Sequence, residues 1–273
     1  MQQELSVSAA GSAAALIKAM LFRRISKHVK DQNWFAVGID FAIVVVGVVL
    51  GIEVANWSDA RADTRLGATY VRQLVEDLET DLANSAAMAS YHAVVLENVV
   101  AATKLLANPK SDDKALVVAA YRASEITNNP ANRETWDQIV SAGHLGLLPQ
   151  AAFDQGIANY YSIAGANDTS TYLLESSDYR KAVRTVIPLA VQLAIREHCS
   201  DEMNENGFIV GFVGDCNLDG IADELPATAT ALRASASIRQ HLPYQYSLVA
   251  IVYANHEQDT LLVKQLLAAL NAE

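Results

Sequence analysis

The pattern of apolar and polar positions divides the chain into three parts. Residues 34–57 form an almost continuous apolar run between Trp34 and Trp57, with only Asp40 and Glu53 charged. As a helix rising about 1.5 Å per residue, this run spans roughly 35 Å, enough to cross a hydrocarbon layer about 30 Å thick. Tryptophan at both ends fits the aromatic belts of membrane interfaces. The run therefore predicts one N-terminal transmembrane helix with Trp34 and Trp57 as interface anchors.

The charge on either side of this run predicts its orientation. Residues 1–33 carry five basic residues against Glu4 and Asp31, while the whole chain has a net charge of −11. A basic leader stays in the cytoplasm, so we expect residues 1–33 inside, in part as an amphipathic basic helix on the inner leaflet, and residues 58–273 in the periplasm. The alternatives fit less well: a cleaved signal peptide would lie nearer the N-terminus, and a buried helix or strand would not need the basic flank.

Two small residues and one acid share a face of the predicted membrane helix. Asp40, Val44, Gly47 and Gly51 follow one another at helical spacings of four, three and four. Gly47-x-x-x-Gly51 is a helix-packing motif, and an intramembrane acid is a functional hypothesis by default. The other interpretation is that Asp40, which is close to the interface, reaches water. The pattern favours association of this helix with a partner or with itself.

The segment from residue 24 to Trp57 resembles a family of bacterial single-pass inner-membrane proteins of unknown function, whose anchor ends in an Asn-Trp pair followed by a long charged helix. The stretches Arg72-Gln-Leu-Val-Glu-Asp-Leu-Glu-Thr-Asp81 and Thr135-Trp-Asp-Gln-Ile-Val-Ser-Ala-Gly-His-Leu-Gly-Leu-Leu-Pro149 are also similar to that family. The resemblance covers roughly residues 20–165. It implies the topology and a helical body, and it brings no catalytic residues.

The outer body has the three-to-four spacing of amphipathic helices. Residues 58–107 show this period, and so do shorter stretches that we expect to be helical at 111–126, 133–148, 150–198, 232–240 and 243–270. Pro188 predicts a kink or a break. No strand pattern is evident, and residues 199–226 predict an irregular loop. The predicted fold class is all-α, with the anchor followed by an extracytoplasmic bundle of long antiparallel helices.

The irregular loop contains both cysteines, Cys199 and Cys216. In an oxidising compartment two such cysteines pair readily, so a periplasmic body predicts a Cys199–Cys216 disulfide. The same loop has Asp215, Asn217 and Asp219 at the first, third and fifth positions of a calcium-loop pattern, with Ile221 and Asp223 at the seventh and ninth. Position twelve is Pro226 instead of the bidentate glutamate. The two interpretations are therefore a calcium site and a plain acidic turn.

Composition and motifs then narrow the function. With 51% apolar and 19% charged residues the chain is not of a disordered type, and its acidic body argues against nucleic acid as a partner. Phosphate-loop, dinucleotide and metalloprotease motifs are absent from the sequence, and we expect no enzyme and no cofactor except a possible Ca²⁺. The favoured function is a membrane-anchored periplasmic scaffold that contacts the bilayer and either another envelope protein or itself. The alternative is a ligand-sensing bundle coupled to the anchor.

Overall fold

The computed structural model describes residues 34–205 and 207–272, without the side chains of residues 34–37, 40 and 164–171. The predicted cytoplasmic helix in residues 1–33 lies outside the described residues. The chain divides into two units, at 1–64 and 65–273, and each is described by itself. The fold is predominantly helical, as the sequence predicts.

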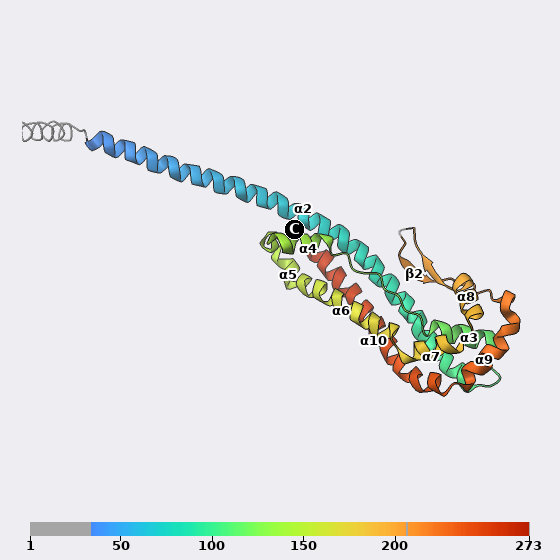
Figure 1. The fold of residues 1–273 in the computed structure, drawn as a ribbon. Coiled ribbons are helices and arrows are strands. Elements are labelled where there is room, and N and C mark those ends of the chain that lie inside the picture. The colour runs from blue at the N-terminus through green and yellow to red at the C-terminus, as the bar shows by residue number, and fades with distance from the viewer. Residues whose placement is uncertain (1–33, 206, 273) are drawn as a thin grey trace, which may run out of the picture. The chain divides into compact units, whose positions relative to one another are not determined.

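Helix α2 runs without interruption from Trp34 to Ala107, so the helix of the apolar run continues into the body (Figure 1). In the first unit its described side chains are exposed, and from residue 41 to residue 52 they are apolar around the whole circumference. Among the described residues α2 is the one helix long and apolar enough to cross a membrane. From Tyr70 onward α2 is amphipathic, with one buried face. The change from an all-round to a one-sided apolar pattern separates a segment suited to lipid from a segment that packs on protein.

The middle of the chain forms four helices and a turn. Asp112 caps α3, since its carboxylate accepts a hydrogen bond from the backbone N–H of Ala115 at 2.6 Å. Gly143 and Gly156, both with positive φ, end α4 and begin α6. The elements are α3 (Asp113–Arg122), α4 (Glu134–Ala142), the 3-10 turn η1 (Leu145–Leu147), α5 (Gln150–Asp154) and α6 (Ile157–Glu175).

The C-terminal part adds two short helices, a hairpin and two further helices. The predicted break at Pro188 is confirmed, because Pro188 lies between α7 and α8 and caps the latter. These elements are α7 (Asp178–Val186), α8 (Leu189–His198), β1 (Asp201–Met203), β2 (Ile209–Phe212), the 3-10 helix η2 (Asp219–Glu224), α9 (Leu225–Ala234) and α10 (Ala236–Leu270).

Two expectations were wrong. Residues 201–212 form a two-stranded antiparallel hairpin, whereas the sequence predicted no strand. Its strands have three and four residues, too few for an alternating pattern to register. Pro243 also does not separate two helices. The break lies at Ser235, whose hydroxyl accepts from the N–H of Ile238, and α10 continues through Pro243, which is exposed and so has room for its ring.

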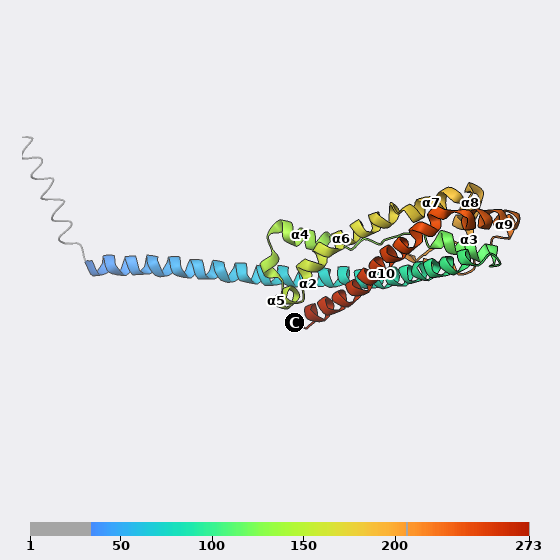
Figure 2. The same ribbon diagram turned by 90° about the horizontal axis from the view of Figure 1, so that it is seen from below.

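Helices α2 and α10 are antiparallel neighbours in the body (Figures 1 and 2). Early residues of the body part of α2, such as Leu74, share a core with late residues of α10, such as Leu266. Later residues of α2, such as Val99, share a second core with Val249 of α10. Helices α6 and α7 also pack against α10. The body thus holds two apolar cores along the same pair of helices, which we call the proximal core (with Leu74) and the distal core (with Val99).

Candidate functional site

A layer of buried polar side chains separates the two cores. On α2 it follows Leu78 of the proximal core and extends from Asp81 to His92, overlapping Met88 and Tyr91 of the distal core, and on α10 it lies between Val252 and Val263. We call it the polar layer, and its buried members are Asp81, Asn84, His92, Tyr160, His256 and Asp259. Polar side chains inside a bundle are retained only where they are hydrogen-bonded, and they fix which residues face each other.

Asp81 is the centre of the hydrogen bonding in this layer. Its Oδ2 accepts from the hydroxyl of Tyr160 at 2.8 Å, and its Oδ1 accepts from the backbone N–H of Asn132 at 2.8 Å. Burial raises the pKa of Asp81 to about 6, the two hydrogen bonds lower it, and the carboxylates of Asp77 and Asp259 raise it further. Asp81 is therefore an acid that exchanges its proton near neutral pH inside the bundle.

Two histidines, His92 of α2 and His256 of α10, join the two helices within the polar layer. The rings of His92 and His256 stack with centroids 5.1 Å apart. The ring nitrogen Nδ1 of His92 hydrogen-bonds the carbonyl of Met88 at 2.9 Å, and its Nε2 is buried without a partner. Burial lowers the pKa of both rings to about 4, and for His256 the neighbouring His92 lowers it further. Both imidazoles are therefore neutral at neutral pH.

A cavity of about 20 Å³ lies in this layer, with Asp81, Asn84, Tyr160, His256 and Asp259 among the residues that line it. This volume is about that of one or two water-sized spheres, far below the several hundred cubic ångströms of an organic ligand site. Within the described part of the chain, His, Cys, Asp and Glu side chains form no group of three placed to hold a metal. The layer is thus suited to fixing the register of α2 against α10.

The segment closed by the disulfide, residues 199–216, contacts Asn129, which lines the cavity of the polar layer. Cys199 and Cys216 form the predicted disulfide. Inside the closed segment, the carbonyl of Ile209 accepts from the side-chain amide of Asn129, a residue that lines the cavity, at 3.1 Å. Arg122 donates to the carbonyl of Val213 at 2.9 Å. The hairpin is therefore tied both to the cavity wall and to α3.

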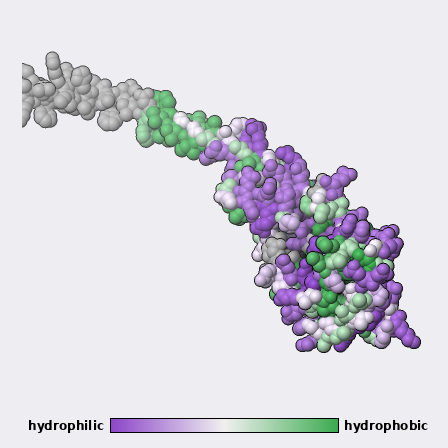
Figure 3. Space-filling model, turned by 45° about the vertical axis from the view of Figure 1, so that its right-hand side comes forward, coloured by the Kyte–Doolittle hydropathy of each residue, from purple (hydrophilic) through white to green (hydrophobic). Residues whose placement is uncertain are grey.

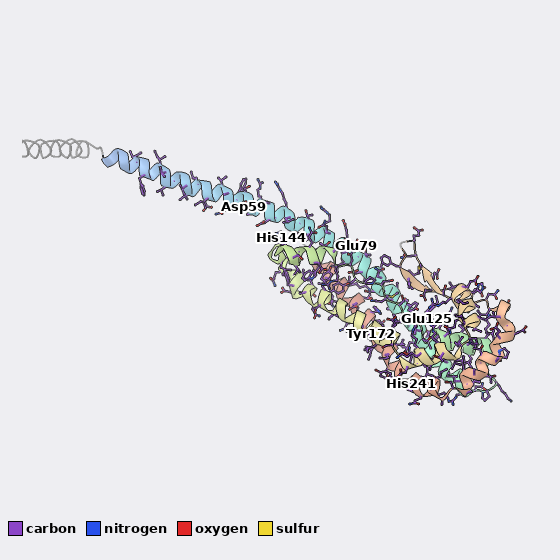
Figure 4. The ribbon with its side chains drawn as sticks, viewed as in Figure 1. Asp59, Glu79, Glu125, His144, Tyr172 and His241 are labelled. Carbon is purple, nitrogen blue, oxygen red and sulfur yellow. A yellow bond between two sulfur atoms is a disulfide. The ribbon has the colours of Figure 1, made fainter. Side chains whose placement is uncertain are left out.

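Charged side chains near the distal core join α3 to α7. Arg184 and Glu125 form an ion pair, with Nη2 and Oε1 3.0 Å apart, and both side chains are more than four-fifths shielded from solvent. The guanidinium of Arg184 lies 3.4 Å from the ring centroid of Tyr121. Glu125 is labelled in Figure 4 among the densely packed side chains near this core. These contacts fix α3 to α7 and have a structural role.

An apolar groove runs along the outside of α2 and α10 in the distal half. It is lined by side chains from residues 93–107 of α2 and 239–253 of α10, and we call it the α2–α10 groove. It consists of two depressions of about 520 and 560 Å³ that meet at Tyr246. Val100 is 39% exposed and Tyr246 is 46% exposed there. The space-filling view shows further apolar residues on the surface of the body (Figure 3).

The predicted calcium ligands lie together in sequence but are not gathered around one point. Asn217 uses its side-chain oxygen to accept from the backbone N–H of Asp219 at 2.9 Å, at the start of η2. Ile221 packs against the distal core, and Asp215, Asp219 and Asp223 are exposed. The geometry is that of an acidic turn, and calcium binding by these residues stays a prediction.

The predicted anchor residues are described in part. Trp57 is exposed, and the guanidinium of Arg61 lies 4.4 Å from its ring centroid. Gly47 and Gly51 have no other atom within 4 Å of where a Cβ would be, so their face of the helix is open. The side chains of Trp34 and Asp40 lie outside the described residues. The packing function of Asp40, Gly47 and Gly51 stays a prediction.

His144 packs against Tyr70 of α2. Its Nδ1 hydrogen-bonds the hydroxyl of Tyr70 at 2.9 Å, so η1 and α2 are joined there (Figure 4). The same contact brings Leu147 so close to Gly67 that a Cβ on Gly67 would lie 2.7 Å from the Leu147 carbonyl oxygen. The histidine thus helps to fix the end of the body at which α4 and α5 lie.

Sequence reasoning missed the polar layer and the groove. The sequence pattern predicts Asp81 on the solvent-exposed face of an amphipathic helix, and it gives no sign that His92 and His256 lie close together. The signal was the interruption of the apolar stripe on both α2 and α10, at residues 81–84 and 256–259. Only the antiparallel pairing of the two helices brings these interruptions to the same level.

No protein-family model matches the chain, and neither a curated protein nor a solved structure matches it. The resemblance to the single-pass family therefore stays a prediction.

Proposed function

We propose that this protein is a membrane-anchored, extracytoplasmic interaction protein without catalytic activity, a scaffold that holds another envelope protein through its helical body. The exposed apolar segment of α2 supports the anchor. The Cys199–Cys216 disulfide supports an oxidising compartment for the body, because disulfides are rare in the cytoplasm.

One observation carries the proposal, namely the α2–α10 groove. Its walls are mostly apolar, and Val100 and Tyr246 expose 39% and 46% of their surface. Contiguous apolar surface of this kind on a folded body favours a protein partner. The groove lies wholly within the second unit, so the proposal does not depend on how the anchor is placed.

The alternative is a sensor that binds a small organic molecule inside the bundle. The polar layer supplies convergent polar groups for it, but the cavity there has room for little more than a water molecule. We therefore base the function on the outer groove and not on the inner cavity.

The test is the native size of the full chain extracted from its own membranes in mild detergent. We expect a complex larger than one chain, and Val100→Arg in the groove should reduce it to the single chain. Leu193→Arg is the matched control, because Leu193 is 57% exposed on α8, outside the groove. A wild-type chain that migrates alone, or a complex that survives Val100→Arg, would refute the proposal.

A further inference from the structure

We infer that the α2–α10 groove binds one helix of a different protein, about four turns long, apolar on one face and acidic at the end that meets Lys104 and Arg239. This inference rests on the proposed function and names the occupant of its groove.

One stripe of the lining residues has the spacing of a helix seam. On α2 this stripe is Ala93, Leu96, Val100, Thr103 and Ala107, at spacings of three, four, three and four, and it is flanked in the lining by Glu97, Val99, Ala101, Lys104 and Leu106. This is the alternation with which side chains of one helix receive those of another. Most of these side chains are small, so the backbone of an incoming helix can approach closely.

The opposite wall has the same character. Arg239, Pro243, Tyr246 and Tyr253 of α10 line the groove at spacings of four, three and seven. Two antiparallel helices that offer matching stripes to one groove leave the place of a third helix in a bundle. From Ala93 to Ala107 the groove is about 21 Å long at 1.5 Å per residue, which equals about four helical turns.

The charges at the rim select the partner. Lys104 and Arg239 lie toward the end of the groove marked by Ala107, and Glu97 lies toward the other end. Within the described residues neither cation takes part in an ion pair. An acidic group on the partner would therefore find two cations that no carboxylate of this chain already holds.

The same charges argue against a second copy as the occupant. Two copies anchored in one membrane in the same orientation are related by an axis along the membrane normal, so equal residues lie at equal height. Lys104 and Arg239 of one copy would then meet the same cations of the other, and like charges at a contact are unfavourable. A different chain with an acidic helix end avoids this repulsion.

The experiment uses three labelled 18-residue peptides and the full chain in lipid nanodiscs. The first peptide is helical, with leucines at heptad spacing and glutamates in one terminal turn. The second replaces those glutamates with lysines. The third is the first with two central prolines, which prevent a continuous helix. Fluorescence anisotropy measures binding, and nanodiscs with the Val100→Arg chain report the background from lipid.

We expect the acidic peptide to bind wild type at least tenfold more tightly than Val100→Arg, and as tightly to Leu193→Arg as to wild type. The lysine peptide should bind about fivefold more weakly, and Arg239→Glu should reverse that preference, because each exposed charge pair changes affinity by a small factor. The proline peptide should not exceed background. Circular dichroism checks folding, and Tyr246→Glu is a second groove variant should Val100→Arg not fold.

The inference is overturned if the acidic peptide does not exceed background, if the proline peptide binds equally well, or if Arg239→Glu leaves the preference unchanged. These results are separable from failure of the proposed function. A native complex that depends on Val100, together with peptides that do not bind, would retain the scaffold and reject the helix. Two differently tagged copies that co-purify through the groove would also reject it, in favour of self-association.

Discussion

Two regions of the α2–α10 pair differ in polarity from their surroundings. Between the helices, the buried polar layer around Asp81, His92 and His256 separates two apolar cores, while the groove on the outside in the distal part is apolar and open. An amphipathic pair usually has apolar side chains inside and polar ones outside. We therefore assign the polar layer to the pairing of the two helices and the groove to another molecule.

Acidification should have the largest effect, and in the polar layer it acts through His92, His256 and Asp81. His92 and His256 have folded pKa values of about 4 against an ordinary 6.5, so the unfolded chain binds their protons first and stability is lost as pH falls from 6.5 to 4. Each imidazole accounts for about 3 kcal/mol of this loss.

Asp81 opposes the histidines. Its folded pKa of about 6 lies above its ordinary 3.8, so it destabilises the folded chain above pH 6, and this penalty of about 3 kcal/mol is relieved as pH falls toward 4. We expect the loss of stability from pH 7 to 4 to be larger in Asp81→Asn than in wild type by about 2–3 kcal/mol. Denaturant unfolding of the detergent-solubilised chain at both pH values measures it. Equal losses in the two proteins would mean that Asp81 does not titrate in this range.

Removal of the disulfide should have the next largest effect. A closed loop of 17 residues stabilises by about 3 kcal/mol in the chain-entropy model, so Cys199→Ser with Cys216→Ser should lower the free energy of unfolding by about that amount. Since the closed segment holds Asn129 over the cavity, amide hydrogen exchange should increase in residues 128–132 and not in residues 239–246. Uniform exchange across both regions would contradict the link between hairpin and layer.

Tyr160→Phe should destabilise by about 2 kcal/mol, because it leaves Oδ2 of the buried Asp81 without its donor. The matched variant Tyr246→Phe removes a hydroxyl at the exposed groove and should change the free energy of unfolding by less than about 0.5 kcal/mol. Chemical denaturation of the two variants compares the inner layer with the outer groove directly. Similar effects of the two substitutions would remove the distinction.

The smallest effect on stability should come from Val100→Ala, below about 0.5 kcal/mol, because Val100 is 39% exposed in the groove. Its neighbour Val99 is 1% exposed in the distal core, so Val99→Ala should lower the free energy of unfolding by about 2 kcal/mol. A large loss of stability in Val100→Ala would place that side chain in the core.

Much of the fold could be predicted from local patterns. The apolar run bounded by Trp34 and Trp57, the helix starting near Asp112, the break at Pro188 and the Cys199–Cys216 pair each depend on a short stretch of sequence or on redox chemistry. The hairpin at residues 201–212 could not, because its strands are too short for a period. Continuity of α10 through Pro243 also escaped prediction, since it depends on the space around the ring.

By itself the sequence determined the helical class, the lipid-suited segment of α2 and the pairing of the two cysteines, because each follows from residue type and spacing within one stretch. The tertiary structure decided that Asp81 and His256, 175 positions apart in the sequence, share one buried cavity. It also decided that Val100 and Tyr246 share an open groove. The physical reason is that burial and pKa depend on which helix faces which, and no periodicity within a single helix records its neighbour.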